Sequence, residues 1–279
     1  MTTSVTKPAP IGVFDSGYGG LTILSEIRRI LPQYDYIYLG DNARAPYGTR
    51  SFEIVHKFTL EAVQYLFNQG CQLIILACNT ASAKALRAIQ QNYLPSHEPH
   101  RRVLGVIRPT VEALGNITHS GHIGLLGTPG TIISGSYTAE VHKLYPDYNV
   151  FGQACPMWVP LIENNEINNE GTEYFVKKYI DALLSQSNDI DTVILGCTHY
   201  PLLKELIGKH LPPHINLLSQ GTLVAESLKD YLVRHPEMEQ RCSKGASCTY
   251  LTTESGDKFA DTATLFLKDS ITTRQIELG

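Results

Sequence analysis

Two cysteines in this chain have the neighbours and spacing that proton chemistry requires. Cys78 opens the segment Cys-Asn-Thr and Cys197 opens the segment Cys-Thr-His, so polar side chains directly follow each sulfur. A thiol with an ordinary pKa of about 8.5 needs only a modest shift to become a thiolate at neutral pH. Most cysteines are small buried hydrophobes without a chemical role. Placed on opposite faces of one carbon, these two could remove a proton from one face and return it to the other.

Each cysteine follows a short apolar run that is typical of a buried strand. Residues 73–77 precede Cys78, and residues 192–195 with one glycine precede Cys197. Helix starts are expected just after both cysteines, where the helix dipole favours negative charge. Further strand patterns at 11–14 and 36–39 alternate with helical periodicity, as at 52–69 between Ser51 and Gly70. Strands alternating with helices predict a parallel sheet that is covered on both faces.

The two halves of the chain repeat the same pattern. Residues 11–17 have a counterpart in 123–129, and residues 73–80 have one in 192–199. The order is the same in both halves, and the separations from Ile11 to Cys78 and from Ile123 to Cys197 are 67 and 74 residues. One such pair could be a chance similarity of apolar strands, but two in register predict a duplicated unit. We therefore expect two pseudo-symmetric, open parallel-sheet α/β domains, with the active site in the cleft between them.

Removing a proton next to a carboxylate also requires donors that stabilise the developing negative charge. Asn79, Thr80 and Thr198 stand where they could provide such donors. Asp15-Ser16 and the Pro46-Tyr47-Gly48 turn offer further polar contacts from neighbouring strand ends. From the residues alone, Asp15 could equally be a solvated turn residue. The glycines at 17, 19 and 20 match neither a dinucleotide fingerprint nor a P-loop, so no nucleotide is implied.

Composition excludes several classes of protein. Of 279 residues, 43% are hydrophobic and 18% charged, so sizeable cores can form. A net charge of −4 with few adjacent basic residues argues against nucleic-acid binding. The apolar runs fall well short of the roughly 20 residues that cross a bilayer. Residues 1–10 are polar and suggest a loose tail rather than a signal segment, so we expect a cytoplasmic protein.

The six cysteines and ten histidines do not form a metal-binding pattern. No Cys-x-x-Cys pair occurs, and the histidines are scattered along the chain. We expect no metal. Cys71, Cys155, Cys242 and Cys248 lack the polar neighbours of the first two cysteines, so we expect them to be structural.

Four segments together resemble the glutamate racemase family: Asp-Ser-Gly-x-Gly-Gly-Leu-Thr (15–22), Pro-Tyr-Gly-Thr (46–49), Cys-Asn-Thr-Ala-Ser (78–82) and Gly-Cys-Thr-His-Tyr-Pro-Leu-Leu (196–203). The resemblance extends over about residues 11 to 270. It implies two domains that enclose glutamate, with one cysteine from each acting as acid or base and no pyridoxal phosphate or metal cofactor. It also implies the supply of D-glutamate for peptidoglycan synthesis, and that Cys78 deprotonates the D form.

The resemblance assigns roles to individual residues. Cys78 and Cys197 would be catalytic, Asp15 would orient Cys78, and His199 with Glu163 would assist Cys197. The residues that would contact the amino acid are Asp15, Ser16, Tyr47, Gly48, Asn79, Thr80, Thr128, Thr131, Thr198 and His199. The chain departs from the commoner family pattern at Asn42, often threonine, and at Arg108, often glutamate. Neither position carries the proton transfer, so these departures bear on regulation or subunit packing.

The resemblance also implies that the domains are not consecutive halves. Residues 11–102 and 220–279 would form the first domain, which carries Cys78, and residues 103–219 would form the second, which carries Cys197. The only partner expected beyond the small-molecule substrate is a second copy of the chain in a homodimer, with no nucleic acid and no membrane.

Three other functions fit parts of the pattern. An aspartate racemase of the same superfamily usually has an acidic residue in place of His199 and lacks the Pro-Tyr-Gly turn. A non-catalytic amino-acid-binding protein would need neither thiol. A cysteine hydrolase would use one cysteine with a histidine base and leave the other unexplained. Glutamate racemisation is therefore the expected activity.

Overall fold

A computed structural model describes residues 7–267 and 270–279. The first six residues of the predicted N-terminal tail lie outside this part of the chain. Near the end of that tail, Ala9 N donates to Arg241 O at 2.9 Å, and Ser243 N donates to Ala9 O at 2.9 Å. These bonds hold the main chain at Ala9 against the segment that leads into the last strands.

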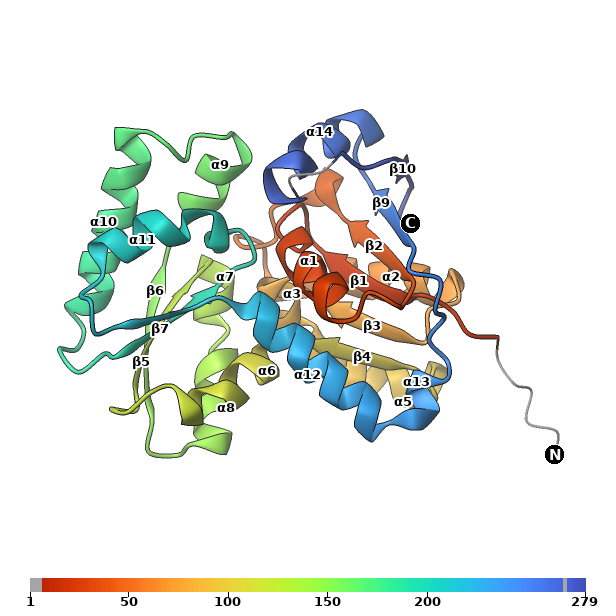
Figure 1. The fold of residues 1–279 in the computed structure, drawn as a ribbon, viewed down its shortest axis with the longest axis horizontal. Coiled ribbons are helices and arrows are strands. Elements are labelled where there is room, and N and C mark those ends of the chain that lie inside the picture. The colour runs from red at the N-terminus through yellow and green to blue at the C-terminus, as the bar shows by residue number, and fades with distance from the viewer. Residues whose placement is uncertain (1–6, 268–269) are drawn as a thin grey trace.

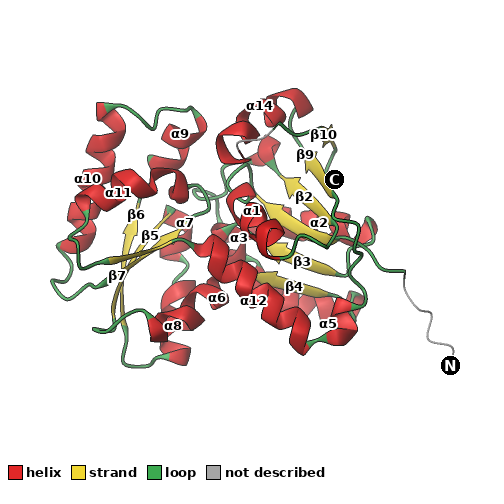
Figure 2. Ribbon diagram, in the orientation of Figure 1, coloured by secondary structure: helices red, strands yellow, loops and turns green. Residues whose placement is uncertain are grey.

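The strands of the described residues form two sheets, of six and of four strands, which lie side by side (Figures 1 and 2). Every strand pair is parallel. The strands of the first sheet, in the order β10-β9-β2-β1-β3-β4, are β1 (Ile11–Asp15), β2 (Tyr36–Gly40), β3 (Leu73–Leu76), β4 (Arg102–Gly105), β9 (Cys248–Thr252) and β10 (Thr273–Gln275). The strands of the second, in the order β6-β5-β7-β8, are β5 (His122–Gly127), β6 (Asn149–Ala154), β7 (Thr192–Gly196) and β8 (Asn216–Leu218).

The two sheets share one topology. Four neighbouring strands of the first sheet run β2-β1-β3-β4, and the second sheet runs β6-β5-β7-β8, so each strand of one has a counterpart four places later. This confirms the pseudo-symmetric, parallel α/β fold that the internal repeat predicts. In both sheets the chain reverses its direction of winding at the first strand, and ligands of open α/β sheets bind at such switch points.

Helices cover both faces of the first sheet. Because successive strand residues point to opposite faces, Val13 packs with α1, α12 and α14, whereas Phe14 packs with α2 and the short helices that follow β3. The helices of this half are α1 (Leu21–Ile30), α2 (Phe52–Asn68), α3 (Asn79–Lys84), α4 (Leu86–Ala88), the π-helix η2 (Ile89–Tyr93), α5 (Leu94–His97), α12 (Gln220–Arg234), α13 (Pro236–Glu239) and α14 (Gly256–Leu267), with a 3₁₀ turn η1 (Asn42–Arg44).

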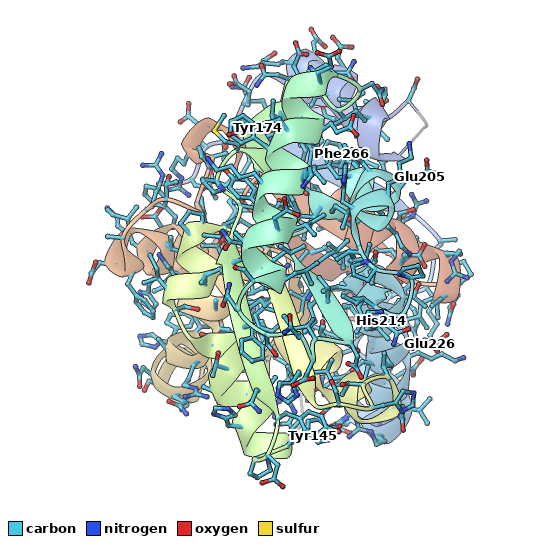
Figure 3. All side chains as sticks on the ribbon, turned by 90° about the vertical axis from the view of Figure 1, so that its left-hand side faces the viewer. Tyr145, Tyr174, Glu205, His214, Glu226 and Phe266 are labelled. Atoms are coloured by element: carbon cyan, nitrogen blue, oxygen red, sulfur yellow. The ribbon has the colours of Figure 1, made fainter. Side chains whose placement is uncertain are left out.

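The second sheet is covered in the same way. Val193 packs with α9 and α10 on one face, and Ile194 packs with α6 and α8 on the other. Figure 3 views this sheet from its outer side, with α10 in front and Tyr174 and Glu205 exposed to solvent. The helices of this half are α6 (Ile107–Glu112), α7 (Pro129–Ile133), α8 (Ser136–Leu144), α9 (Trp158–Glu163), α10 (Glu170–Leu184) and α11 (Lys204–His210), with 3₁₀ turns η3 (Ala113–Asn116) and η4 (Tyr200–Leu203).

Local sequence explains where the helices begin and end. Ser51 caps α2 by accepting a hydrogen bond from Ile54 N, as its position before the apolar period predicts. Gly70 adopts a φ of +97° just beyond the end of α2, a conformation that favours glycine. Cys78 itself is the N-cap of α3. The position of this first catalytic candidate is therefore determined locally, where β3 ends and α3 begins.

The chain crosses between the sheets twice. It leaves the first sheet after β4 through α6, and it returns after β8 through α12, which packs against both α1 and α6 (Figure 1). The two crossing helices, α6 and α12, therefore join the sheets and pack on each other on one side of the site. Within the described residues, no helix has the length and apolar character needed to span a bilayer.

Candidate active site

A cleft opens between the two sheets at the carboxyl ends of their central strands. It has a cavity volume of about 100 Å³, so only a very small molecule would fit in it. Its walls come from the loops after β1, β2 and β3 of the first sheet and after β5, β6 and β7 of the second. The lining residues are Ser16, Gly17, Ala45, Pro46, Tyr47, Gly48, Thr49, Cys78, Asn79, Thr80, Thr128, Pro129, Cys155, Pro156, Val159, Pro160, Glu163, Cys197, Thr198 and His199.

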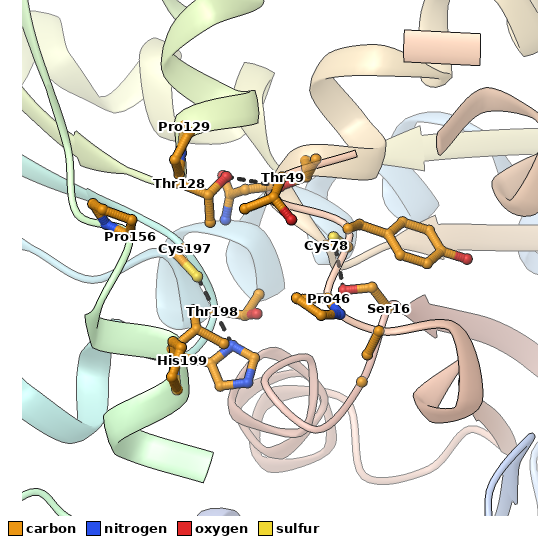
Figure 4. Close-up of a pocket in the computed structure, with 18 of the residues that line it drawn as sticks. Ser16, Pro46, Thr49, Cys78, Thr128, Pro129, Pro156, Cys197, Thr198 and His199 are labelled. Atoms are coloured by element: carbon orange, nitrogen blue, oxygen red, sulfur yellow. Dashed lines mark hydrogen bonds between the residues drawn. The ribbon is translucent and has the colours of Figure 1, made fainter. Parts of the chain in front are cut away.

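Cys78 and Cys197 lie on opposite walls of this cleft (Figure 4). Each follows one of the paired central strands, β3 in the first sheet and β7 in the second. Both are nearly buried, with exposed fractions of 5% and 6%. The two thiols therefore reach one small cavity from different sheets, as the internal repeat predicts.

Cys78 is held as a thiol at the start of α3. Its sulfur accepts a hydrogen bond from Ala81 N at 3.4 Å, and the thiol donates toward Ser16 Oγ at 3.4 Å. Burial raises the pKa of Cys78 to about 12, the Asp15 carboxylate adds to that rise, and the hydrogen bonds with Ser16 and Ala81 oppose it. At neutral pH in this state Cys78 is protonated and can act as an acid.

Cys197 is the first member of a chain of contacts that runs through His199 to Glu163, called the relay below. Its Sγ lies 3.8 Å from His199 Nδ1, and His199 Nε2 lies 2.9 Å from Glu163 Oε1. Burial lowers the pKa of His199, but the hydrogen bonds to Cys197 and Glu163 outweigh burial and raise it to about 10. The imidazole is therefore protonated at neutral pH, and its charge faces the Cys197 sulfur.

Asp15 is fully buried at the end of β1. Its Oδ2 accepts a hydrogen bond from Gly17 N at 2.9 Å, and its Oδ1 accepts one from Thr198 Oγ1 at 3.4 Å. Burial raises the pKa of Asp15, while the positive charge of His199 opposes that rise. Asp15 is thus not a solvated turn residue; it links the first sheet to the polar residue that follows Cys197.

The loop after β1 approaches the second sheet very closely. At Gly19, a Cβ atom would overlap Thr198 Oγ1 and the imidazole of His199. Only glycine allows this approach. Gly19 therefore serves the close packing of the two loops.

Three threonine hydroxyls meet between the sheets beside Cys78. Thr80 Oγ1 lies 3.0 Å from Thr128 Oγ1 and 3.3 Å from Thr131 Oγ1, and the last two lie 3.1 Å apart. Thr80 and Thr128 line the cleft, and Thr131 is buried behind them. Hydroxyls can rotate to donate to an anion, so this cluster is suited to a carboxylate.

The Pro46-Tyr47-Gly48 turn is anchored from behind. The Tyr47 hydroxyl donates to Asp41, which is fully buried and also accepts bonds from Arg44 Nε at 2.7 Å and Thr253 Oγ1 at 2.9 Å. At the other end of the turn, Gly48 O accepts a bond from Gly130 N at 2.7 Å. What the turn offers the cleft is therefore its main chain and ring face, because the phenol is already bonded.

The side-chain amide of Asn79 also forms most of its hydrogen bonds within the protein. Its amide bonds to Gln220 and to Tyr137, both at 2.6 Å. The residue still borders the cleft, but toward a ligand it can use only its main chain and its remaining amide hydrogen. Neither Gln220 nor Tyr137 stands out in the sequence, since no local pattern connects them with residue 79.

The structure thus gathers most of the expected residues in one place. All of them line the cleft except Asp15 and Thr131, which lie directly behind it. Sequence reasoning missed Cys155, which lines the wall beside Pro156 and Val159. Its thiol donates to Gln153 O at 3.6 Å, and burial raises its pKa well above the ordinary value, so it stays a neutral thiol. Its position directly after β6 was the signal that could have pointed to the cleft.

The two departures from the family pattern have separate surroundings. Asn42 Oδ1 accepts a bond from Thr252 Oγ1 at 3.1 Å. Arg108, on α6, pairs with Glu112 and with Glu140 of α8, both at 2.7 Å, on an exposed surface. Neither contact involves a cysteine of the cleft. In the described part of the chain, no three His, Cys, Asp or Glu side chains are grouped to hold a metal ion.

This chain is similar to known proteins in sequence and, where their structures are solved, in fold. The family model of Asp/Glu/hydantoin racemases matches residues 19–228. A glutamate racemase of Persephonella marina is 46% identical over 220 residues, which are 78% of this chain and 81% of that protein. The crystal structure of a glutamate racemase isoform from Bacillus anthracis superposes with a TM-score of 0.88 at 36% identity, and that of the Francisella tularensis glutamate racemase in complex with D-glutamate with 0.85 at 32%; both comparisons cover 98% of each chain.

Proposed function

The chain belongs to the Asp/Glu/hydantoin racemase family, and from this membership we propose that it interconverts L-glutamate and D-glutamate. The observation that carries the proposal is the pair of strand-end thiols, Cys78 and Cys197, on opposite walls of one cleft. Inversion at the α-carbon needs an acid and a base on its two faces, and a hydrolase or a binding protein would need at most one of these thiols. The similarity to glutamate racemases over nearly the whole chain supports glutamate as the substrate.

In the direction from L to D, Cys197 acts as the base. Its thiolate, whose negative charge is balanced by the His199 imidazolium 3.8 Å away, removes the α-proton from one face and becomes a thiol. Glu163 holds that imidazole through its other nitrogen. Cys78, a thiol because of its raised pKa, then gives its proton to the opposite face. The reverse reaction exchanges the two roles, with Cys78 as the base toward D-glutamate.

The proton leaves more easily when the substrate carboxylate is held by donors. We assign this task to the hydroxyls of Thr80 and Thr128 and to the main chain of Asn79 and Thr198, with Thr131 supporting the cluster. Ser16 and the Tyr47–Gly48 turn border the same cavity and would contact the rest of the amino acid. Asp15 acts from behind, through Thr198 and through its charge near Cys78.

The cellular role follows from the activity. We propose that the enzyme works in the cytoplasm and supplies D-glutamate for peptidoglycan synthesis, as a monomer or a homodimer. The domain division into 11–102 with 220–279 and 103–219 belongs to the same proposal, with the first boundary moved to follow Gly105, because β4 (Arg102–Gly105) pairs with β3 of the first sheet. It is supported by the fact that the chain crosses between the sheets near both of these boundaries.

The test incubates pure protein with L-glutamate in deuterated water without added cofactor. Optical rotation follows inversion, and mass spectrometry follows α-deuterium in the product. Loss of rotation with one solvent deuterium at the α-carbon supports the proposal. L-Aspartate in a parallel reaction identifies the nearest alternative, and no turnover of either amino acid would refute a racemase of this class.

Cys78→Ser and Cys197→Ser test the paired roles. Each should abolish racemisation, because a serine hydroxyl is far too weak an acid and base for this step. A control at the third cysteine of the cleft, Cys155→Ser, should keep most of the activity. Full activity in either of the first two variants would contradict the two-thiol mechanism while leaving the substrate assignment intact.

A further inference from the structure

A ring of three buried hydrogen bonds lies behind the cleft, where helices of the two sheets meet. The Tyr137 hydroxyl donates to Asn79 Oδ1, Asn79 Nδ2 donates to Gln220 Oε1, and Gln220 Nε2 donates back to the Tyr137 hydroxyl, each at 2.6 Å. Each side chain gives one bond and accepts one, and each is at most 2% exposed. Buried polar groups of this kind are costly unless all are paired, and here they pair with one another.

The neighbours of the ring permit only one orientation of the Gln220 amide. Gln220 Nε2 also donates to Thr110 Oγ1 at 2.8 Å, and the Thr110 hydroxyl donates to Val106 O at 2.8 Å. If the amides of Gln220 and Asn79 were both reversed, the ring itself would still close, but Gln220 Oε1 would face Thr110 Oγ1, whose hydrogen is already donated. The network therefore fixes the Asn79 side chain as well as its own members.

The members of the ring come from the elements that join the two sheets. Asn79 is the first residue of α3 and directly follows Cys78, whereas Tyr137 lies on α8 of the second half. Thr110 lies on α6 and Gln220 is the first residue of α12, and these helices are the two crossings of the chain. The ring thus ties the start of α3 to both crossings and to a helix of the opposite sheet.

We propose that Gln220 is a positioning residue for proton transfer: through Asn79 it fixes the start of α3, and with it the Cys78 thiol, relative to the sheet that carries Cys197. The inference rests on the proposed function, because it concerns a proton that Cys78 carries. It also explains why Asn79, at the edge of a ligand cleft, commits its amide to the protein. A misplacement of the thiol by about 1 Å would be enough to slow the transfer by one or two orders of magnitude.

A network that only stabilises the fold would give different results from one that positions Cys78. The variants are Tyr137→Phe, which removes one hydroxyl, and Gln220→Met, which removes the amide at similar volume. The matched control is Tyr36→Phe: Tyr36 is equally buried and its hydroxyl donates to Leu31 O at 2.7 Å, at the end of β2 away from the cleft. All three variants lose a buried hydrogen bond, so all should melt at a lower temperature than the wild type.

Only the ring variants should change the chemistry. We expect kcat for both enantiomers to fall about tenfold in Tyr137→Phe and Gln220→Met, with KM within about threefold, and kcat to be unchanged in Tyr36→Phe. The double variant Tyr137→Phe/Gln220→Met should be no slower than the slower single variant, because either change already opens the ring. Multiplied losses in the double variant, or an unchanged kcat in Tyr137→Phe, would overturn the inference.

A second readout does not depend on turnover. Iodoacetamide should alkylate Cys78 several times faster in both ring variants than in the wild type or Tyr36→Phe, as followed by mass spectrometry of the Cys78 peptide. If the wild type does not racemise glutamate, the proposed function fails, and the alkylation rates still decide whether the ring holds Cys78. Equal rates in all proteins would overturn the inference. Should Gln220→Met fail to fold, Tyr137→Phe alone is sufficient for both readouts.

Discussion

Glu163 and His199 form a largely buried ion pair across the wall of the cleft, with Oε1 2.9 Å from Nε2. Glu163 ends α9, and His199 follows β7, so the contact joins two elements of the second sheet. The second nitrogen of the same ring faces Cys197. Glu163 therefore reaches the Cys197 thiol only through His199. Its effect on the chemistry must come from its influence on the protonation of that imidazole.

Replacing Glu163 by glutamine should move the pH dependence of the reaction. Glutamine keeps an oxygen acceptor for the ring but removes the negative charge, so the pKa of His199 falls from about 10. Because protonated His199 balances the charge on Cys197, the basic limb of the kcat/KM profile should move to lower pH. This shift is measured from the pH profiles of kcat/KM for both enantiomers. The control variant is Glu166→Gln, because Glu166 is an exposed acid outside the cleft. An unshifted limb in Glu163→Gln would contradict the relay.

The same imidazole makes stability depend on pH in a defined direction. The pKa of His199 is raised from an ordinary value of about 6.5 to about 10 in the folded protein. A group with a raised folded pKa contributes stability that is complete below its unfolded pKa and is lost as the pH rises through its folded pKa. The difference in melting temperature between the wild type and His199→Gln should therefore become smaller as the pH rises from about 6.5 to about 10. A difference that stays constant across this window would disprove the ion pair.

Much of the site could be predicted because it lies at strand ends. Apolar runs that stop at Asp15, Cys78 and Cys197 are local patterns, and the shared topology of the two sheets brings such ends together. The repeat also predicted two domains with a common fold. Here the sequence was sufficient, since strand, turn and helix start all lie within a few neighbouring residues.

Other features depend on contacts that no local pattern records. Gln220 meets Asn79 across 141 residues of sequence, and Tyr137 meets it across 58. Tyr47 lines the cleft, but its hydroxyl is bonded to the buried carboxylate of Asp41. The partners of Asn79 are determined by how the helices of the two halves pack on each other, whereas Asp41 and Tyr47 meet within the loop that follows β2. The sequence therefore predicted which loops form the site, but not how each polar side chain within them is used.

Asp15→Asn should make the protein more stable and less active. Burial raises the pKa of Asp15, so its ionised form costs stability at a pH above the raised value. Asparagine can keep both hydrogen bonds, accepting from Gly17 N and donating to Thr198 Oγ1, without a buried charge. We expect a higher melting temperature at pH 8 and a loss of kcat of about tenfold or more. If the variant melts lower than the wild type, the charge of Asp15 stabilises the fold.

Gly19→Ala tests the close approach of the two loops. The new Cβ would overlap Thr198 Oγ1 and the His199 ring, so the loop after β1 must move away from Cys197. Overpacking of this kind costs about 1 to 3 kcal/mol of stability, and kcat/KM should fall by about 100-fold.

The matched control is Gly208→Ala in α11, where nothing lies within 4 Å of the added atom. Alanine there should raise stability by up to about 1 kcal/mol, as expected inside a helix, and leave kcat/KM unchanged. Chemical denaturation and racemisation assays on the three proteins decide the question. Wild-type activity in Gly19→Ala would mean that the loops can separate without loss of the reaction, and the close packing of Gly19 on His199 would then have no part in catalysis.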